Sequence, residues 1–247
     1  MGGGVGVSVH APIRVATDNT VYAMPETGIG FFTDVGGSYF LSRVNHNIHL
    51  GLFLGLTGHR LKGRELVQWG IATHFVPQTQ LESLYGDLKA RVTNKTTKQE
   101  ILDIVMNHSD FDPFNDPIPH IEEIDRIFYA DSIQNIYERI MQSETEFGAK
   151  VRKQIASLSP LSMAIVFEQI RRGHNLNLKE SFEMEYKIAD GFVHHTEFFE
   201  GVRALLIDKD KSPKWKHKTV LDVKKEDVDF FFDRKAQINL DLSQYKE

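Results

Sequence analysis

Apolar and polar positions follow one pattern up to about residue 77 and a different pattern after it. In the first part, short runs of β-branched and aromatic residues alternate with glycines and turn residues. Three of these runs predict short strands, at 13–17, 20–24 and 70–77. Stretches with helical spacing lie between them, at about 36–58 and 63–69. Strands that alternate with helices in this way predict an α/β layer.

After residue 77, apolar residues recur mainly with helical spacing. Ser159 followed by Pro160 is typical of a helix start, and Asn177 three residues before Glu180 resembles a capping box. Three helical faces are expected to pack into a core. They are Met163, Val166 and Ile170; Leu178, Phe182 and Tyr186; and Phe198, Val202 and Leu205. The acidic, proline-containing segment 108–120 has no period and predicts a loop.

The composition is that of a globular protein, and it disfavours several functional classes. The chain has 247 residues, of which 41% are hydrophobic and 26% charged, as in ordinary globular proteins. A net charge of −5 disfavours a dedicated nucleic-acid binder, and the basic stretch 209–218 is expected to be a solvated segment. The absence of cysteine excludes a thiol nucleophile and thiolate metal sites. No apolar run reaches the roughly 18 residues that a membrane span needs.

A run of glycines, "GGGVG" at 2–6, is the first candidate for chemistry. A glycine-rich turn that leads into a helix leaves backbone N–H groups without intrahelical partners. Such groups can stabilise a developing oxyanion or hold a phosphate, although a tight packing turn has the same composition. The run alone does not decide between these roles.

Two acidic residues are the next candidates. Glu26 follows Pro25 and precedes glycines at the end of a predicted strand, where catalytic carboxylates often lie, although an exposed or capping glutamate is more frequent. Asp34 has apolar neighbours and a glycine pair after it. It is either a helix cap, the interpretation we favour, or a carboxyl with a shifted pKa. If the glycines fold the chain back, the two carboxyls can divide acid and base roles.

Other sites of chemistry are not indicated. The 11 histidines show no metal-ligand spacing, and His194 and His195 are interpreted as surface residues. There is no phosphate-binding P-loop, dinucleotide fingerprint or nucleophile elbow. We therefore expect neither a metal nor a nucleotide cofactor.

Taken together, three stretches resemble the crotonase superfamily and, within it, the 3-hydroxyisobutyryl-CoA hydrolases. They are 1–44, which contains "PETGIGFFTD"; 54–77, "LGLTGHRLKGRELVQWGIATHFVP"; and 198–215, "FFEGVRALLIDKDKSPKW". The resemblance implies an α/β fold, a spiral of ββα turns with a helical C-terminal region. Residues 1–77 would be the C-terminal part of the ββα core and 78–247 the mainly helical region that completes the domain. It also implies that the chain begins partway through such a domain, so that the spiral is N-terminally truncated.

The resemblance also implies roles for individual residues. Gly3 would donate its N–H to the oxyanion of a CoA thioester, while the second donor of the family comes from an earlier turn that this sequence lacks. Glu26 would attack the thioester directly or activate water. Asp34 would orient the substrate hydroxyl or shuttle a proton to the leaving thiolate, although Thr33 stands where the family usually has proline. Gly6 stands where the hydratases have their first glutamate, so hydration is disfavoured.

The implied activity is hydrolysis of a 3-hydroxyacyl-CoA thioester, most specifically 3-hydroxyisobutyryl-CoA in valine breakdown. CoA belongs to the substrate, so no cofactor is expected. The expected partner is this small molecule, without nucleic acid or membrane, and self-association into a homo-oligomer stays open. The resemblance implies a mitochondrial location, although no targeting segment precedes Gly2. The alternatives are a non-catalytic fragment that acts as an interaction module, and another crotonase activity such as isomerase or hydratase.

Overall fold

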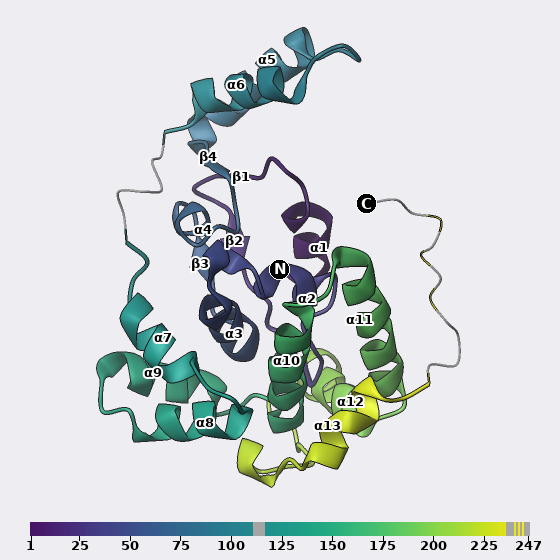
Figure 1. Cartoon of the computed structure of the whole chain (residues 1–247). Coiled ribbons are helices and arrows are strands. Elements are labelled where there is room, and N and C mark those ends of the chain that lie inside the picture. Colours follow the sequence, from purple (N-terminus) through teal and green to yellow (C-terminus); the bar gives the residue numbers. More distant parts are fainter. Residues whose placement is uncertain (111–116, 236–239, 241, 243, 245–247) are drawn as a thin grey trace. The chain divides into compact units, whose positions relative to one another are not determined.

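The computed structural model describes residues 1–110, 117–235, 240, 242 and 244 (Figure 1). The chain forms two compact units, and each is discontinuous in sequence. Unit 1 contains residues 1–6, 23–59 and 120–247, and unit 2 contains residues 7–22 and 60–119. Residue 77 lies within unit 2, and the division of the family domain into 1–77 and 78–247 stays a prediction.

Unit 2 holds the strands. β1 (Val15–Ala16) pairs in parallel with β4 (His74–Phe75), and β2 (Val21–Tyr22) pairs antiparallel with β3 (Leu61–Lys62). The three predicted strands are thus confirmed, although each is shorter than its sequence run, and β3 was not predicted. The helices of this unit are α4 (Glu65–Gln68), the 3₁₀ turn η3 (Gln78–Gln80), α5 (Leu81–Arg91) and α6 (Lys98–His108).

A small core joins α5 and α6 to the end of β4. Its buried members are Val76, Leu84, Ile104 and Val105. α6 begins at a capping box, in which the Thr97 hydroxyl and the Glu100 carboxylate satisfy each other's backbone N–H groups. The predicted loop over 108–120 follows α6. Its residues 111–116 lie outside the described part of the chain, and its described residues after His108 form no helix or strand.

Unit 1 is built from helices. α1 (Gly3–Val9) begins in this unit and ends in unit 2. The others are η1 (Glu26–Ile29), α2 (Gly37–Leu41), η2 (Val44–His46), α3 (Ile48–Thr57), α7 (Ile121–Phe128), α8 (Ile133–Gln142), α9 (Glu146–Ile155), α10 (Pro160–Gly173), α11 (Leu178–Val193), α12 (Thr196–Val202), the π-helical η4 (Arg203–Ile207), η5 (Val220–Asp222) and α13 (Lys225–Phe232).

The helical stretch predicted over 36–58 is interrupted. Asn45 and His46 have positive φ angles of 45° and 57°, which turn the backbone out of the right-handed helix between α2 and α3. α3 is apolar on every side and is buried, because it contacts α2, α7 and α10 (Figure 1).

The helix that the sequence predicts from Ser159 and Pro160 is confirmed as α10, which contacts α2, α3 and α13 in unit 1. The Ser159 hydroxyl caps it by accepting from the Ser162 N–H at 3.0 Å, and Pro160 occupies its first position. The predicted face of Met163, Val166 and Ile170 is buried. α10 approaches α2 so closely that a Cβ at Gly173 would lie 2.1 Å from the Ser38 carbonyl oxygen.

α11 begins where predicted but buries a different face. Asn177 and Glu180 form the predicted capping box. The predicted core residues Leu178, Phe182 and Tyr186 are only half-buried. The buried positions are instead Ser181, Glu185, Ile188, Gly191 and Phe192. The pattern of apolar residues could not show this face, because two of its members are polar.

α12 also differs from its prediction. Phe198, Val202 and Leu205 are half-buried, whereas Gly201 and Ala204 are buried. A Cβ at Gly201 would lie 2.0 Å from the Ile29 carbonyl oxygen, so the missing side chain lets α12 contact η1 directly. Small residues therefore form the contact surface that larger apolar residues were expected to form.

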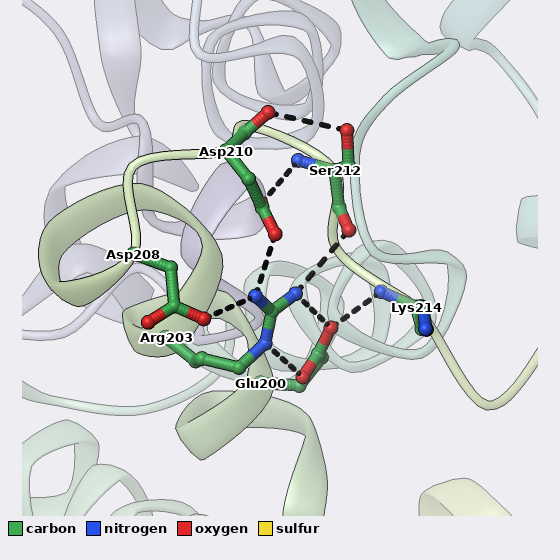
Figure 2. A network of polar contacts seen from close by, with 6 residues as sticks. All are labelled: Glu200, Arg203, Asp208, Asp210, Ser212 and Lys214. Atoms are coloured by element: carbon green, nitrogen blue, oxygen red, sulfur yellow. Dashed lines mark hydrogen bonds and ion pairs between the residues drawn. The ribbon is translucent and has the colours of Figure 1, made fainter.

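The C-terminal basic segment is organised by Arg203 (Figure 2). Its guanidinium bonds both oxygens of Glu200, at 2.8 and 2.9 Å, and donates to Asp208 and Asp210, each at 2.7 Å. The Lys214 N–H donates to Glu200 at 2.7 Å, which folds the following turn back onto α12. The lysines of 209–218 are exposed, as predicted.

In the part of the chain that the structure describes, no helix has the length and apolar character required to cross a membrane.

Candidate active site

Glu26 lies at the first position of η1 and is buried, with 6% of its surface exposed. η1 is a single turn closed by the Gly28 N–H, which donates to the Pro25 carbonyl oxygen at 2.9 Å. It ends at Gly30, whose φ of +68° lies in the left-handed region that favours glycine. A Cβ at Gly30 would also lie 2.4 Å from the Glu197 carbonyl oxygen, so both backbone angle and space fix this turn.

One oxygen of the buried Glu26 carboxyl, Oε2, is left without a hydrogen bond among the described residues. Burial raises the pKa of Glu26 from 4.5 to about 8, and the nearby charge of Asp34 raises the pKa as well, although a hydrogen bond from its own backbone N–H lowers it. A pKa raised this far lets Glu26 change charge near neutral pH.

Asp34 lies on the loop between η1 and α2 and is half-buried. Burial raises its pKa, and a hydrogen bond from its own backbone N–H opposes part of this rise. The predicted helix cap is wrong, because α2 begins after Gly36, which is the N-cap residue. Asp34 contributes its backbone carbonyl there, which accepts from the Gly37 N–H at 2.9 Å. The alternative interpretation, a carboxyl with a shifted pKa, agrees with the structure.

The start of α2 is capped by a residue from α11. The Glu185 carboxylate accepts hydrogen bonds from the Gly36 N–H at 2.8 Å, and from the N–H and hydroxyl of Ser38 at 2.8 and 2.7 Å. Burial raises the pKa of Glu185 to about 7, although these hydrogen bonds lower it. Sequence reasoning missed this residue, since a glutamate within a helix is usually solvent-exposed.

Gln169 of α10 holds the same loop from another side. Its amide nitrogen donates to the Thr33 carbonyl oxygen at 2.6 Å and to the Ser38 hydroxyl at 3.0 Å. The Thr33 hydroxyl donates back to the Gln169 amide oxygen at 3.1 Å. Thr33 is therefore held in place by hydrogen bonds to the Gln169 side chain.

The backbone beside Asp34 is strained. Val35 has a φ of 56°, in the left-handed region that β-branched residues rarely adopt, and Gly36 follows with a φ of 83°. Backbone strain of this kind persists only where the surrounding structure holds it, and it is concentrated at functional sites.

The glycine run adjoins Glu26 and the residue that follows Asp34. A Cβ at Gly2 would lie 3.4 Å from the Glu26 Oε1 atom, which places the start of α1 beside this carboxyl. Gly3 is the first residue of α1 and is exposed. No atom of the described residues lies within 4 Å of the place where a Gly3 Cβ would be. A Cβ at Gly6 would lie 2.5 Å from the Val35 Cβ. The residue before α1 therefore lies beside Glu26, and the fourth residue of α1 lies against Val35.

The sequence that forms this site matches a known family over most of its length. Residues 1–232 match the family model described as "Enoyl-CoA hydratase/isomerase". The chain belongs to this family. The resemblance to crotonase-type proteins, and to the 3-hydroxyisobutyryl-CoA hydrolases among them, is confirmed.

Relatives in this family carry one recurring name. The chain is 44% identical over 245 residues to the mitochondrial 3-hydroxyisobutyryl-CoA hydrolase of Danio rerio, covering 98% of this chain and 64% of that protein. It is 42% identical over 237 residues to the protein of the same name from Homo sapiens, covering 94% of this chain and 60% of that protein. The chain thus spans about three-fifths of the length of these curated relatives.

Solved structures in the family share the fold. A carnitinyl-CoA dehydratase from Mycobacterium thermoresistibile superimposes with a TM-score of 0.85 at 29% identity, over 99% of this chain and 68% of that one. An enoyl-CoA hydratase from Rhodobacter sphaeroides gives a TM-score of 0.74 at 30% identity, over 94% of this chain and 65% of that one. The predicted crotonase-like α/β fold is confirmed.

The predicted roles of Glu26, Asp34 and Gly3 stay predictions, although the structure brings the first two within electrostatic reach of each other. The interpretation of His194 and His195 as surface residues is confirmed for His194, which is exposed, and holds only in part for His195. Its ring is half-buried, accepts from the Glu197 N–H at 3.2 Å and caps α12. Burial lowers its pKa. In the described residues, no group of three or more histidine, aspartate and glutamate side chains could hold a metal ion.

Proposed function

We propose that this protein hydrolyses a 3-hydroxyacyl-CoA thioester, with 3-hydroxyisobutyryl-CoA as its substrate. The observation that carries the proposal is the pair formed by buried Glu26 and Asp34, whose carboxyl pKa values are both raised, beside a glycine-rich helix start. The names of the relatives from Danio rerio and Homo sapiens support the substrate. The same names support a mitochondrial location. No cofactor is needed, since CoA is part of the substrate.

Glu26 can act by either of two routes. In the first, its carboxylate attacks the thioester carbon, the C–S bond breaks, and CoA leaves as a thiolate that takes up a proton. Water then cleaves the resulting anhydride to give the free acid and restore Glu26. In the second, the carboxylate takes a proton from water while the water oxygen attacks the same carbon, and the C–S bond then breaks as the leaving thiolate takes up a proton. Both routes consume one water and release the acid and CoA.

The other residues act on the charges that develop. The Gly3 N–H, at the start of α1, donates a hydrogen bond to the oxyanion of the tetrahedral intermediate. Asp34 orients the 3-hydroxyl group of the substrate or supplies the proton to the leaving thiolate. Burial raises the pKa of Asp34, which favours the protonated form that a proton donor needs.

Gly6 separates this proposal from hydration of a double bond. A glycine has no carboxylate to position or deprotonate water. A side chain at this position would also collide with Val35, whose Cβ lies 2.5 Å from the place of a Gly6 Cβ. α1 therefore has no room for a glutamate there unless the Asp34 loop moves.

Product analysis tests the proposal. The purified protein is mixed with 3-hydroxyisobutyryl-CoA, and free thiol is followed by reaction with a chromogenic disulfide. A parallel reaction with crotonyl-CoA is examined for 3-hydroxybutyryl-CoA by chromatography. We expect thiol release from the first substrate and no hydration of the second. Hydration without thiol release would contradict the proposal and favour a hydratase.

A further inference from the structure

The cap of α2 comes from a distant part of the chain. α2 is short, and the two residues at its start, Gly36 and Gly37, have no side chain that could accept a hydrogen bond from its first N–H groups. Asp34, which sequence reasoning favoured as the cap, does not take this role. Glu185 accepts from the Gly36 N–H and from Ser38 instead, across a separation of 149 and 147 residues in the chain.

This arrangement leaves Asp34 available for another task. Hydrogen bonds from helix N–H groups favour the charged form of a carboxyl, which makes that group a poorer proton donor than it would be without them. Burial instead raises the pKa of Asp34, and its charge acts on both Glu26 and Glu185. Asp34 thus interacts electrostatically with two buried carboxyl groups, and one of these, Glu185, bonds the loop that carries Asp34.

The contacts of Glu185 fall at the strained point of that loop. Val35 and Gly36 both have positive φ angles, and the Gly36 N–H is one of the three donors to Glu185. Ser38, fully buried, is bonded by Glu185 and by Gln169 together. Loss of the Glu185 carboxylate would leave buried N–H groups without an acceptor, and the loop could relax toward an ordinary backbone conformation.

We propose that Glu185 is a positioning residue, whose hydrogen bonds to Gly36 and Ser38 hold the strained turn and thereby fix the Asp34 carboxyl within reach of Glu26. The inference rests on the proposed function, because it concerns the geometry of that site. Glu185 itself does not touch the substrate in this account and acts only through Asp34.

A double-mutant cycle tests this role. Glu185→Gln keeps the size of the side chain but presents an amide N–H₂ group where one of the carboxylate oxygens accepted. We expect it to lower kcat for 3-hydroxyisobutyryl-CoA by about 10²-fold, the effect of a misplaced catalytic group. In an Asp34→Asn background, the same substitution should change kcat less than about twofold, since the group that it positions is already lost.

Two further variants separate positioning from stability. Ile188→Val removes one buried methylene from the same face of α11, so it should lower the melting temperature while kcat stays at the wild-type value. Ser38→Ala removes one hydroxyl and no backbone contact. It should lower kcat by a smaller factor that again vanishes in the Asp34→Asn background. If Glu185→Gln does not fold, the cycle of Ser38→Ala with Asp34→Asn tests the positioning role in its place.

The outcomes distinguish the two proposals. Thiol release by the wild-type protein, together with equal losses of kcat for Glu185→Gln or Ser38→Ala in both backgrounds, would overturn the positioning role alone. A wild-type kcat in folded Glu185→Gln would do the same. No thiol release by the wild-type protein would overturn the proposed function, and the positioning role with it.

Discussion

On folding, the Glu26 carboxyl loses the water molecules that would stabilise its charged form. Among the described residues, no hydrogen-bond donor replaces them at Oε2. The pKa of Glu26 is therefore raised from 4.5 to about 8, chiefly by burial. Between these two pH values the folded protein binds the Glu26 proton more tightly than the unfolded chain does. The free energy of unfolding thus falls as pH rises through this window.

The first prediction concerns this pH dependence. Glu26→Gln should have a melting temperature that falls less than that of the wild-type protein between pH 5 and pH 9, because glutamine cannot become charged. The difference follows from thermal unfolding at both pH values. Glu138→Gln is the control, since Glu138 is exposed on α8. If the melting temperatures of Glu26→Gln and Glu138→Gln fall by the same amount between pH 5 and pH 9, folding does not raise the pKa of Glu26.

The second prediction concerns the glycines of α1. Gly6→Ala should lower the free energy of unfolding by about 1–3 kcal/mol, because its Cβ would meet the Val35 Cβ at 2.5 Å. Gly4→Ala is the matched control on the same helix, with no atom of the described residues within 4 Å of its Cβ, and it should be neutral or stabilising by up to about 1 kcal/mol. Chemical denaturation measures both. Equal free energies of unfolding for Gly6→Ala and Gly4→Ala would show that α1 does not pack closely against Val35.

At the scale of elements, local signals predicted where helices begin. Ser159 with Pro160, and Asn177 with Glu180, are confirmed as helix starts because capping involves residues close in sequence. The buried face of α11 was not predictable in the same way. Glu185 faces the core because it accepts hydrogen bonds from the start of α2, and a sequence pattern does not contain that partner.

The third prediction belongs to the turn after η4. Arg203→Gln removes the ion pairs to Glu200, Asp208 and Asp210 that fold this turn (Figure 2). We expect trypsin to cleave faster after Lys209 and Lys211, and mass spectrometry of timed digests will show the sites. Arg126→Gln, which loses only an exposed pair with Glu123, should leave these cleavage rates unchanged. Unchanged cleavage rates after Lys209 and Lys211 in Arg203→Gln would show that these ion pairs do not hold the turn.

For the whole molecule, the sequence predicted the α/β class, the family and the candidate pair of Glu26 and Asp34. It could do so because the glycine run and both acidic residues lie within one short segment of 1–44. It could not predict Gln169 or Glu185, which reach the Asp34 loop from residues more than 130 positions away. Nor could it predict the raised pKa of Glu26, because burial is a property of the folded chain.

The central claim is that Glu26 carries the hydrolysis of the thioester. Steady-state kinetics of Glu26→Gln with 3-hydroxyisobutyryl-CoA tests it most directly, with Glu138→Gln measured beside it. The account predicts a fall in kcat of about 10²–10⁴ for Glu26→Gln, the range for loss of a positioned acid or base, and wild-type kcat for Glu138→Gln. A kcat for folded Glu26→Gln within about threefold of the wild-type value would contradict the account and remove Glu26 from the mechanism.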